Sequence, residues 1–241
     1  LPLFRSSSEI VYEPKGLSLV ISPWNFPFNL SLIPLVSAVA AGNCIMLKPS
    51  ELSPNSSALI QKMLAACFPP GEVSVFLGDA EVAQDLLSLP FNHIFFTGSP
   101  QVGKIVMRAA AEHLSSVTLE LGGKSPVIVD ETADLDTAAA KIAWLNAMNA
   151  GQICIAPDYV LAHESIHDTL VEKIVEKTKK FYGADMEKIR QSPDFCRIVH
   201  PKHLKRLQNL QEDALRRGAK LAFGGQAYEA DLFYPPTLLT H

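Results

Sequence analysis

Residues 16–48 read GLSLVISPWNFPFNLSLIPLVSAVAAGNCIMLK, and this stretch decides the fold. Its first part, Gly16 to Ser22, is a short apolar run that ends in a turn rich in proline and asparagine, which predicts a strand. A long apolar helix to Ala41 follows, and CIMLK at Cys44 to Lys48 is the next predicted strand. A strand, a helix and a second strand in this order are typical of a parallel sheet.

The same alternation continues along the chain. Further strands are predicted at 73–77, 93–97 and 117–121, with helices at 55–67, 80–87 and 102–112. A second cycle has strands at 126–129, 159–162 and 220–223, with helices at 135–147, 166–181 and 203–217. The Gly122-Gly123 pair between the cycles is the predicted hinge. The sequence therefore predicts an α/β fold, with a Rossmann-like parallel-sheet domain followed by a second α/β domain.

The composition is that of a globular protein. The chain has 241 residues, 48% hydrophobic and 19% charged, which is enough for a sizeable core. Its formal charge is -4 and its Lys and Arg residues are scattered singly, so we expect no nucleic-acid partner. The longest apolar stretch, 26–41, is interrupted by polar residues and a proline and is shorter than the ~18 apolar residues of a spanning helix. We expect a buried helix there and no membrane segment.

Four cysteines are widely spaced, with no CxxC pair and no histidine cluster at zinc-ligand spacing, so we expect neither disulfides nor a metal site. Free thiols fit a reducing compartment, and the cytoplasm is the expected location. Cys44 lies in an apolar strand and Cys67 at a helix end, where both have a structural role. Cys196, between Phe195 and Arg197, is expected at or near the surface.

Cys154 differs from the other cysteines in its context. Gly151-Gln152 precedes it and Ala156-Pro157 follows it, shortly after a predicted helix. This places the thiol on an exposed loop, where backbone amides can approach a substrate oxygen. The pattern favours a nucleophile at this position.

Glu120 lies within the apolar run VTLEL, directly before two glycines that let the backbone approach another group closely. One interpretation is a strand residue that faces solvent or pairs with Lys124. The other is a buried general base, which would be suited to activating water. The residues alone leave both interpretations open.

Asn25 stands in the SPWNFP turn before the long apolar helix. It is either an ordinary turn residue or helix cap, or an amide donor to the oxyanion of a tetrahedral intermediate. Spacing alone does not choose between these roles.

Two further segments suggest cofactor binding. The loop from Gly98 through Ser99 to Gly103 joins a strand to a helix whose first amides could receive a diphosphate, although it is not a GxGxxG motif and a plain turn fits as well. Lys48 and Glu51 follow an earlier strand, where they could hold ribose hydroxyls at the carboxyl edge of a parallel sheet. Their alternative is a solvated capping pair.

Taken together, four segments resemble one family. They are SPWNFPFNLSLIPLVSAVAAGNCIMLKPSELS at 22–53, FFTGSPQVGK at 95–104, VTLELGGKSP at 117–126 and GQICIAPDYV at 151–160. In this order they resemble the aldehyde dehydrogenase superfamily. The cysteine segment, with Ala-Pro-Asp-Tyr after the nucleophile, is most similar to the class 3 and fatty-aldehyde branch. The resemblance spans the chain but only an internal portion of the family pattern, so we expect a fragment that lacks both ends.

The resemblance implies roles for individual residues. Cys154 would be the catalytic thiol, Glu120 the general base, and Asn25 an oxyanion donor together with the Cys154 backbone amide. Residues that would line the cofactor, NAD or NADP, are Trp24, Lys48, Glu51, Gly98, Ser99 and Gly103.

The resemblance also implies a division of the chain. Residues 1–12 would be part of a bridging or oligomerisation strand, residues 13–123 the NAD(P)-binding domain, and residues 124–241 a truncated catalytic domain. We therefore expect a homodimer or a higher homo-oligomer. Glu51 disfavours the 2′-phosphate of NADP and Lys48 could compensate for it, so the preference between the two cofactors stays open.

The implied reaction is oxidation of a small-molecule aldehyde to a carboxylic acid through a cysteine thiohemiacetal and a thioester. Medium to long aliphatic or aromatic aldehydes are the expected substrates. Two alternatives stay open, namely a CoA-acylating aldehyde dehydrogenase and a non-catalytic cofactor-binding or scaffold remnant.

Overall fold

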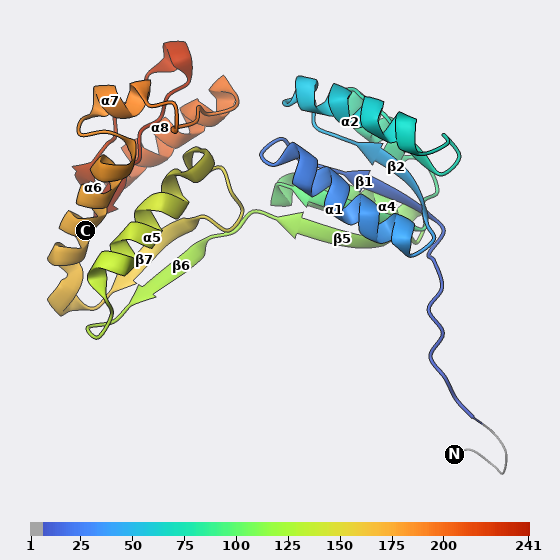
Figure 1. The fold of residues 1–241 in the computed structure, drawn as a ribbon, viewed down its shortest axis with the longest axis horizontal. Helices are drawn as coiled ribbons and strands as arrows, with labels where there is room; N and C mark the ends of the chain where they lie inside the picture. Colours follow the sequence, from blue (N-terminus) through green and yellow to red (C-terminus); the bar gives the residue numbers. More distant parts are fainter. Residues whose placement is uncertain (1–6) are drawn as a thin grey trace. The chain divides into compact units, whose positions relative to one another are not determined.

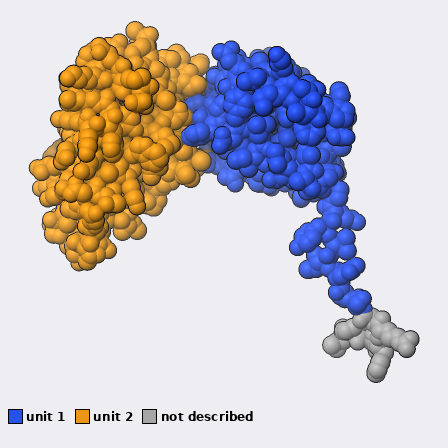
Figure 2. Space-filling model, viewed as in Figure 1, with its two compact units in different colours: residues 1–121 blue, residues 122–241 orange. Residues whose placement is uncertain are grey.

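The structure is a computed structural model that describes residues 7–241. The chain forms two compact units that divide between Leu121 and Gly122, at the first glycine of the predicted hinge pair (Figure 2). Each unit has its own sheet and its own hydrophobic core. We therefore describe each unit by itself.

The first unit alternates strands and helices, as predicted. Its strands are β1 (Leu17–Ile21), β2 (Cys44–Lys48), β3 (Val73–Val75), β4 (His93–Gly98) and β5 (Ser116–Leu121). Its helices are α1 (Pro27–Ala40), α2 (Pro54–Cys67), α3 (Ala80–Leu87) and α4 (Pro100–Glu112). The strands form one parallel sheet in the order β3-β2-β1-β4-β5.

Helices cover both faces of this sheet, which explains why its three central strands, β2, β1 and β4, are largely apolar. On one face, Val20 and Leu47 pack with residues of α1 and α2 (Figure 1). On the other, Leu19 and Phe96 pack with residues of α3 and α4. The alternation of side chains along each strand thus feeds two separate cores.

The strand order changes direction at β1. From β1 the chain runs outward to β2 and β3, and then returns to place β4 on the opposite side of β1. The loops that follow β1 and β4 therefore leave the carboxyl edge of the sheet toward opposite faces, where α1 and α4 pack. In open α/β sheets this switch point is where ligands bind.

The second unit has less sheet and more helix. Its strands are β6 (Ser125–Val129) and β7 (Pro157–Ala162), which pair in parallel, and β8 (Lys220–Phe223) and β9 (Leu238–Thr240), which pair antiparallel. Its α-helices are α5 (Leu135–Ala147), α6 (His167–Tyr182), α7 (Met186–Gln191) and α8 (Pro201–Arg216), and its 3-10 turns are η1 (Met148–Gly151), η2 (Glu164–Ile166) and η3 (Glu229–Asp231). The core against β6 and β7 is made by residues of α5 and α6, including Ala139 and Leu170.

The predicted α/β fold class is confirmed, and most elements begin and end within a few residues of their predicted positions. Two short elements, α7 and β9, were not predicted because neither is long enough to show a clear period. The expectation that helix 26–41 is buried is wrong for part of its surface, since Ile33 and Val36 are each 61% exposed.

The predicted N-terminal strand falls partly outside the described residues. Residues 1–6 are not described, and residues 7–15 form neither helix nor strand. The role of residues 1–12 in a bridging element therefore stays a prediction. None of the helices formed by residues 7–241 combines the length and apolar character that a membrane crossing requires. Within the same residues, no group of three or more His, Cys, Asp or Glu side chains could hold a metal ion.

Replacing Leu19 by alanine tests the central strand. Leu19 is fully buried in β1, so Leu19→Ala leaves a cavity and should lower the free energy of unfolding by about 2–5 kcal/mol. Leu59→Ala, on the half-exposed surface of α2, should cost less than about 1 kcal/mol. Urea denaturation measures both, and equal losses would contradict the assignment of β1 to the core.

Asp136 gives a prediction of pH dependence in the second unit. Hydrogen bonds from Lys173 (2.8 Å) and then Lys177 (2.7 Å) lower the pKa of Asp136 from its usual value of 3.8 to about 2. A carboxylate with a lowered pKa stabilises the fold above its usual pKa, and this contribution is lost as the pH falls. Asp136→Asn should therefore be less stable than the wild type at neutral pH, and the difference should shrink between about pH 4 and pH 2.

Glu172→Gln is the matched control, because Glu172 is an exposed carboxylate on α6, the helix that carries Lys173 and Lys177. The Asp136 effect should weaken in high salt, since the carboxylate is itself largely solvated. A difference between Asp136→Asn and wild type that stays constant from neutral pH down to pH 2 would contradict the ion pair.

Candidate active site

The carboxyl edge of the first sheet gathers most of the predicted cofactor residues. Trp24 and Asn25 lie in the loop after β1, and both are partly buried. Asn25 does not cap α1, because the N-cap position belongs to Phe26, which makes no side-chain cap bond. The cap interpretation of Asn25 is therefore wrong, and the donor interpretation stays a prediction.

Lys48 and Glu51 lie at the end of β2 and in the turn that follows it. The Lys48 ammonium is 3.1 Å from Glu51 Oε2 and also donates to the Pro49 carbonyl at 3.2 Å. Lys48 is only 3% exposed, whereas the Glu51 side chain is 46% exposed. The alternative of a solvated capping pair is therefore wrong for Lys48, whose charge is held within the fold and has an acidic partner.

The turn between β4 and α4 contains small residues that pack closely against their neighbours. Ser99 is the N-cap of α4, and its hydroxyl accepts a hydrogen bond from the Val102 amide at 3.3 Å. Gly103 is buried one turn into the helix, where a Cβ would lie 3.0 Å from a methyl group of Leu121. At Gly98 a Cβ would lie 2.4 Å from the ring of Phe96. Gly103 thus lets α4 lie close to β5, whereas Gly98 leaves room for the Phe96 ring of its own strand.

Glu120 lies near the end of β5, the edge strand of the same sheet, opposite Thr97 of β4. It is exposed within its unit, which agrees with the interpretation of a strand residue that faces solvent. The neighbours Leu119 and Leu121 face the core formed with α4, which turns Glu120 to the other face of the strand. Lys124, its other candidate partner, belongs to the second unit, where it pairs with Asp158 at 3.0 Å.

Cys154 lies in the second unit, in the loop between η1 and β7, and it is exposed as predicted. All four cysteines are exposed, which contradicts the structural interpretation of Cys44 and Cys67 and means that exposure alone does not single out Cys154. What distinguishes it is the backbone. The loop begins with left-handed residues, Asn149 (φ 49°), Ala150 (φ 53°) and Gly151 (φ 74°).

The left-handed residues are followed by a turn that carries the thiol. The Ala156 amide donates to the Ile153 carbonyl at 3.2 Å, which places Cys154 at the first central position of a β-turn. Left-handed backbone at Ala150 costs of order 1–3 kcal/mol, so the surrounding structure must hold it. The thiol is thus presented by a strained and tightly turned segment.

Gly123 holds this loop from the hinge side. A Cβ on Gly123 would lie 2.5 Å from the Cys154 carbonyl oxygen, so only glycine permits this approach. The glycine pair was predicted to allow a close backbone approach, and Gly123 makes one while Gly122 has nothing within 4 Å of its Cβ position. The identity of the partner was not predictable, because Cys154 is far from Gly123 in sequence.

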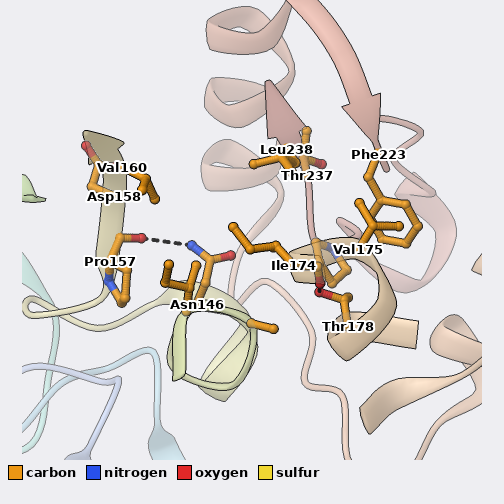
Figure 3. A pocket seen from close by; sticks show the side chains of 13 residues that line it. Asn146, Pro157, Asp158, Val160, Ile174, Val175, Thr178, Phe223, Thr237 and Leu238 are labelled. Carbon is orange, nitrogen blue, oxygen red and sulfur yellow. Dashed lines mark hydrogen bonds between the residues drawn. The ribbon is translucent and has the colours of Figure 1, made fainter. Parts of the chain in front are cut away.

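A pocket of about 80 Å³ lies beneath the exit of the Cys154 loop. Figure 3 shows the Asn146 amide at its wall, donating to the Pro157 carbonyl at 2.9 Å. Most of the lining is apolar, with Ile174, Phe223 and Leu238 among the contributors. The Asn146 bond fixes the start of β7, where the loop ends.

The predicted residues thus fall into two groups. Asn25, Glu120 and the six cofactor residues belong to the first unit, where they follow β1, β2 and β4 or lie on β5 and α4. Cys154 belongs to the second unit. The structure brings the first group to one edge of one sheet, and it presents Cys154 on a braced loop.

Substituting alanine for Gly122 or Gly123 tests whether Gly123 holds the Cys154 loop in place. Gly123→Ala places a methyl group against the Cys154 carbonyl, so the backbone must shift, and the free energy of unfolding should fall by about 1–3 kcal/mol. Gly122→Ala meets open space and should change it by less than about 0.5 kcal/mol. Urea denaturation followed by circular dichroism measures both, and equal stabilities for the two variants would contradict the close approach.

Comparison with known proteins agrees with this arrangement. Residues 4–241 match the model of the aldehyde dehydrogenase family. The chain is 46% identical over 241 residues to 4,4′-diaponeurosporen-aldehyde dehydrogenase of Staphylococcus aureus, covering all of this chain and 51% of that protein. It is 47% identical over 228 residues to aldehyde dehydrogenase family 3 member A2 of Pongo abelii, covering 95% of this chain and 45% of that protein.

Solved structures agree with the sequence relatives. The substrate-bound state of Staphylococcus aureus AldH is similar with a TM-score of 0.87 and 46% identity, over 94% of this chain and 48% of that one. A lactaldehyde dehydrogenase is similar with a TM-score of 0.86 and 34% identity, over 94% of this chain and 48% of that one. The chain spans about half the length of the relatives it matches. By sequence and by fold, the chain belongs to the aldehyde dehydrogenase family, and its relatives include family 3 members, as the resemblance implied.

Proposed function

We propose that the protein containing this chain oxidises an aldehyde to a carboxylic acid with NAD or NADP, using Cys154 as the nucleophile. The observation that carries the proposal is the Cys154 loop, whose exposed thiol sits in a β-turn braced by Gly123. A thiol that is held in one position by its loop, next to closely packed backbone atoms, is suited to attack a carbonyl carbon. Membership of the aldehyde dehydrogenase family supports the reaction class.

The first unit fits a dinucleotide. Gly103 lets the first turns of α4 lie close against β5, and the Ser99 hydroxyl caps the N-terminus of α4. Lys48 and Glu51 present an ammonium and a carboxylate at the same edge, where ribose hydroxyls can be held, and Trp24 would complete the lining. When bound, the nicotinamide ring supplies the acceptor for a hydride.

The chain's own residues supply the remaining chemistry. The Cys154 thiolate adds to the carbonyl carbon, and the Asn25 amide and the Cys154 backbone amide donate to the oxygen that becomes negative. The carbon loses a hydride, which leaves a thioester on Cys154. Glu120 removes a proton from water, which attacks the thioester and releases the acid and the thiol. The exposure of Glu120 within its unit suits a base that must exchange its proton with solvent.

Two other functions have less support from the residues of this chain. A CoA-acylating enzyme would hand the acyl group to a thiol and would not need a base at Glu120. A non-catalytic cofactor-binding or scaffold protein would not need the strained loop that presents Cys154. Both are outcomes of the test below.

The substrate class, location and assembly are further parts of the proposal. We infer medium to long aliphatic or aromatic aldehydes, which agrees with a relative of 46% identity named for 4,4′-diaponeurosporen-aldehyde. The four free cysteines support a cytoplasmic location. A homodimer or higher homo-oligomer would provide partners for residues 7–15, which form neither helix nor strand.

Aldehyde oxidation by the complete protein and its variants tests the proposal. Wild type should form reduced NAD or NADP from hexanal or benzaldehyde, whereas Cys154→Ala should form none and still bind the cofactor. Cys67→Ala is the matched control, because its thiol is also exposed. Glu120→Gln should keep a first-turnover burst and lose about 10²-fold or more in steady-state rate, because only hydrolysis needs the base.

The alternatives predict different results. Turnover that requires coenzyme A would favour the acylating enzyme. Cofactor binding without turnover by the wild type would favour the scaffold. Equal activity of wild type and Cys154→Ala would show that another residue is the nucleophile.

A further inference from the structure

The Gln152 carboxamide joins the Cys154 loop to a separate part of the second unit. Its nitrogen donates to the Asn149 carbonyl at 2.9 Å and to the Arg197 carbonyl at 3.0 Å. Its oxygen accepts from the Val199 amide at 3.0 Å. One side chain, two positions before Cys154, therefore makes three bonds to backbone atoms.

The first of these bonds lies within the strained part of the loop. Asn149 is the first of the left-handed residues, and its carbonyl also accepts from the Gln152 backbone amide at 3.1 Å. Both donors of Gln152 thus close the same short turn. Since left-handed Ala150 is unfavourable by itself, these bonds help to hold the conformation from which the Cys154 turn starts.

The other two bonds reach residues 195–199, which we call the anchor segment. Phe195 and Ile198 in this segment are 5% and 2% exposed. The Ile198 amide donates to the Leu232 carbonyl at 2.9 Å. Phe195 and Ile198 therefore anchor the segment in the core of the unit, and the segment can act as a fixed support.

An ion-pair network fastens the anchor segment to its surroundings. The Arg197 guanidinium lies 3.4 Å from Asp231 Oδ2 and 5.1 Å from the centroid of the Phe233 ring. Asp231 also receives two hydrogen bonds from Arg190, at 3.0 and 3.2 Å. These contacts keep the carbonyl of Arg197 in place for the Gln152 amide.

We propose that Gln152 is the positioning residue for Cys154, and that its carboxamide fixes the nucleophile loop against the anchor segment. This inference rests on the proposed function for its catalytic consequence. Only a carboxamide of this length can donate to two carbonyls and accept from an amide at once. A glutamate keeps the shape but turns a donor into an anionic oxygen beside two carbonyl oxygens.

Gln152→Glu and Gln152→Met in the complete protein test the inference, with Gln191→Glu and Gln191→Met as matched controls. Gln191 makes its hydrogen bond with Glu187 on the exposed surface of α7. Both Gln152 variants should lose about tenfold or more in kcat per folded molecule, counted by circular dichroism, while KM for the aldehyde stays within about threefold. The controls should match wild type.

A second readout is independent of aldehyde oxidation. The rate of Cys154 alkylation by iodoacetamide, followed by peptide mass spectrometry, should shift by more than about threefold in the Gln152 variants. The rate of Cys67, an exposed thiol in the first unit, should not change in the same samples. If wild type does not oxidise aldehydes, the proposed function fails while the alkylation rates still test the position of the thiol.

Some results would overturn the inference. Wild-type kcat and wild-type alkylation of Cys154 in both folded Gln152 variants would show that the carboxamide does not position the thiol. An equal loss in the Gln191 variants would show a general effect of the substitution. If Gln152→Glu does not fold, the Gln152→Met variant decides by the same measurements.

Discussion

Strand β1 is hydrogen-bonded on both sides, to β2 and to β4, and this parallel pairing organises the whole first unit. Because the chain leaves β1 toward β2 and returns beside it as β4, the loops after these two strands diverge at the carboxyl edge. Every residue expected to hold the dinucleotide follows a strand at this edge or lies at the start of α4. The proposed cofactor half of the site would therefore be a consequence of strand order, with the side chains only refining it.

The second unit holds the exposed thiol of Cys154 in one orientation. An exposed loop is ordinarily mobile, and the left-handed residues before Cys154 add strain to it. The structure offsets both tendencies with contacts to backbone atoms. Gly123 lies against the Cys154 carbonyl, Asn146 binds Pro157 at the exit, and Gln152 binds the anchor segment at the entry.

Much of the fold could be predicted from the sequence, because the apolar runs and helical periods are regular. The positions of Cys154 and of the cofactor residues were also predictable, since each follows a strand or a helix that the pattern marks. The sequence left the orientation of Glu120 open, and the structure turns it to the exposed face of β5. An apolar run suggests burial on both faces, but β5 is the edge strand, and a single strand does not reveal its place in the sheet.

The contacts that hold the Cys154 loop in place could not be predicted from the sequence, for a related reason. Gly123 and Gln152 both stand beside motifs that mark the site, but their partners are backbone atoms far along the chain. A backbone partner leaves no residue type to recognise, because any residue at positions 197 and 199 offers a carbonyl and, unless it is proline, an amide. The sequence does show the residue types that such a contact requires. They are a glycine where a Cβ would not fit, and a carboxamide where one side chain must both donate and accept hydrogen bonds. Residues of these two types beside a candidate nucleophile therefore indicate that its backbone is held, even when they do not indicate by what.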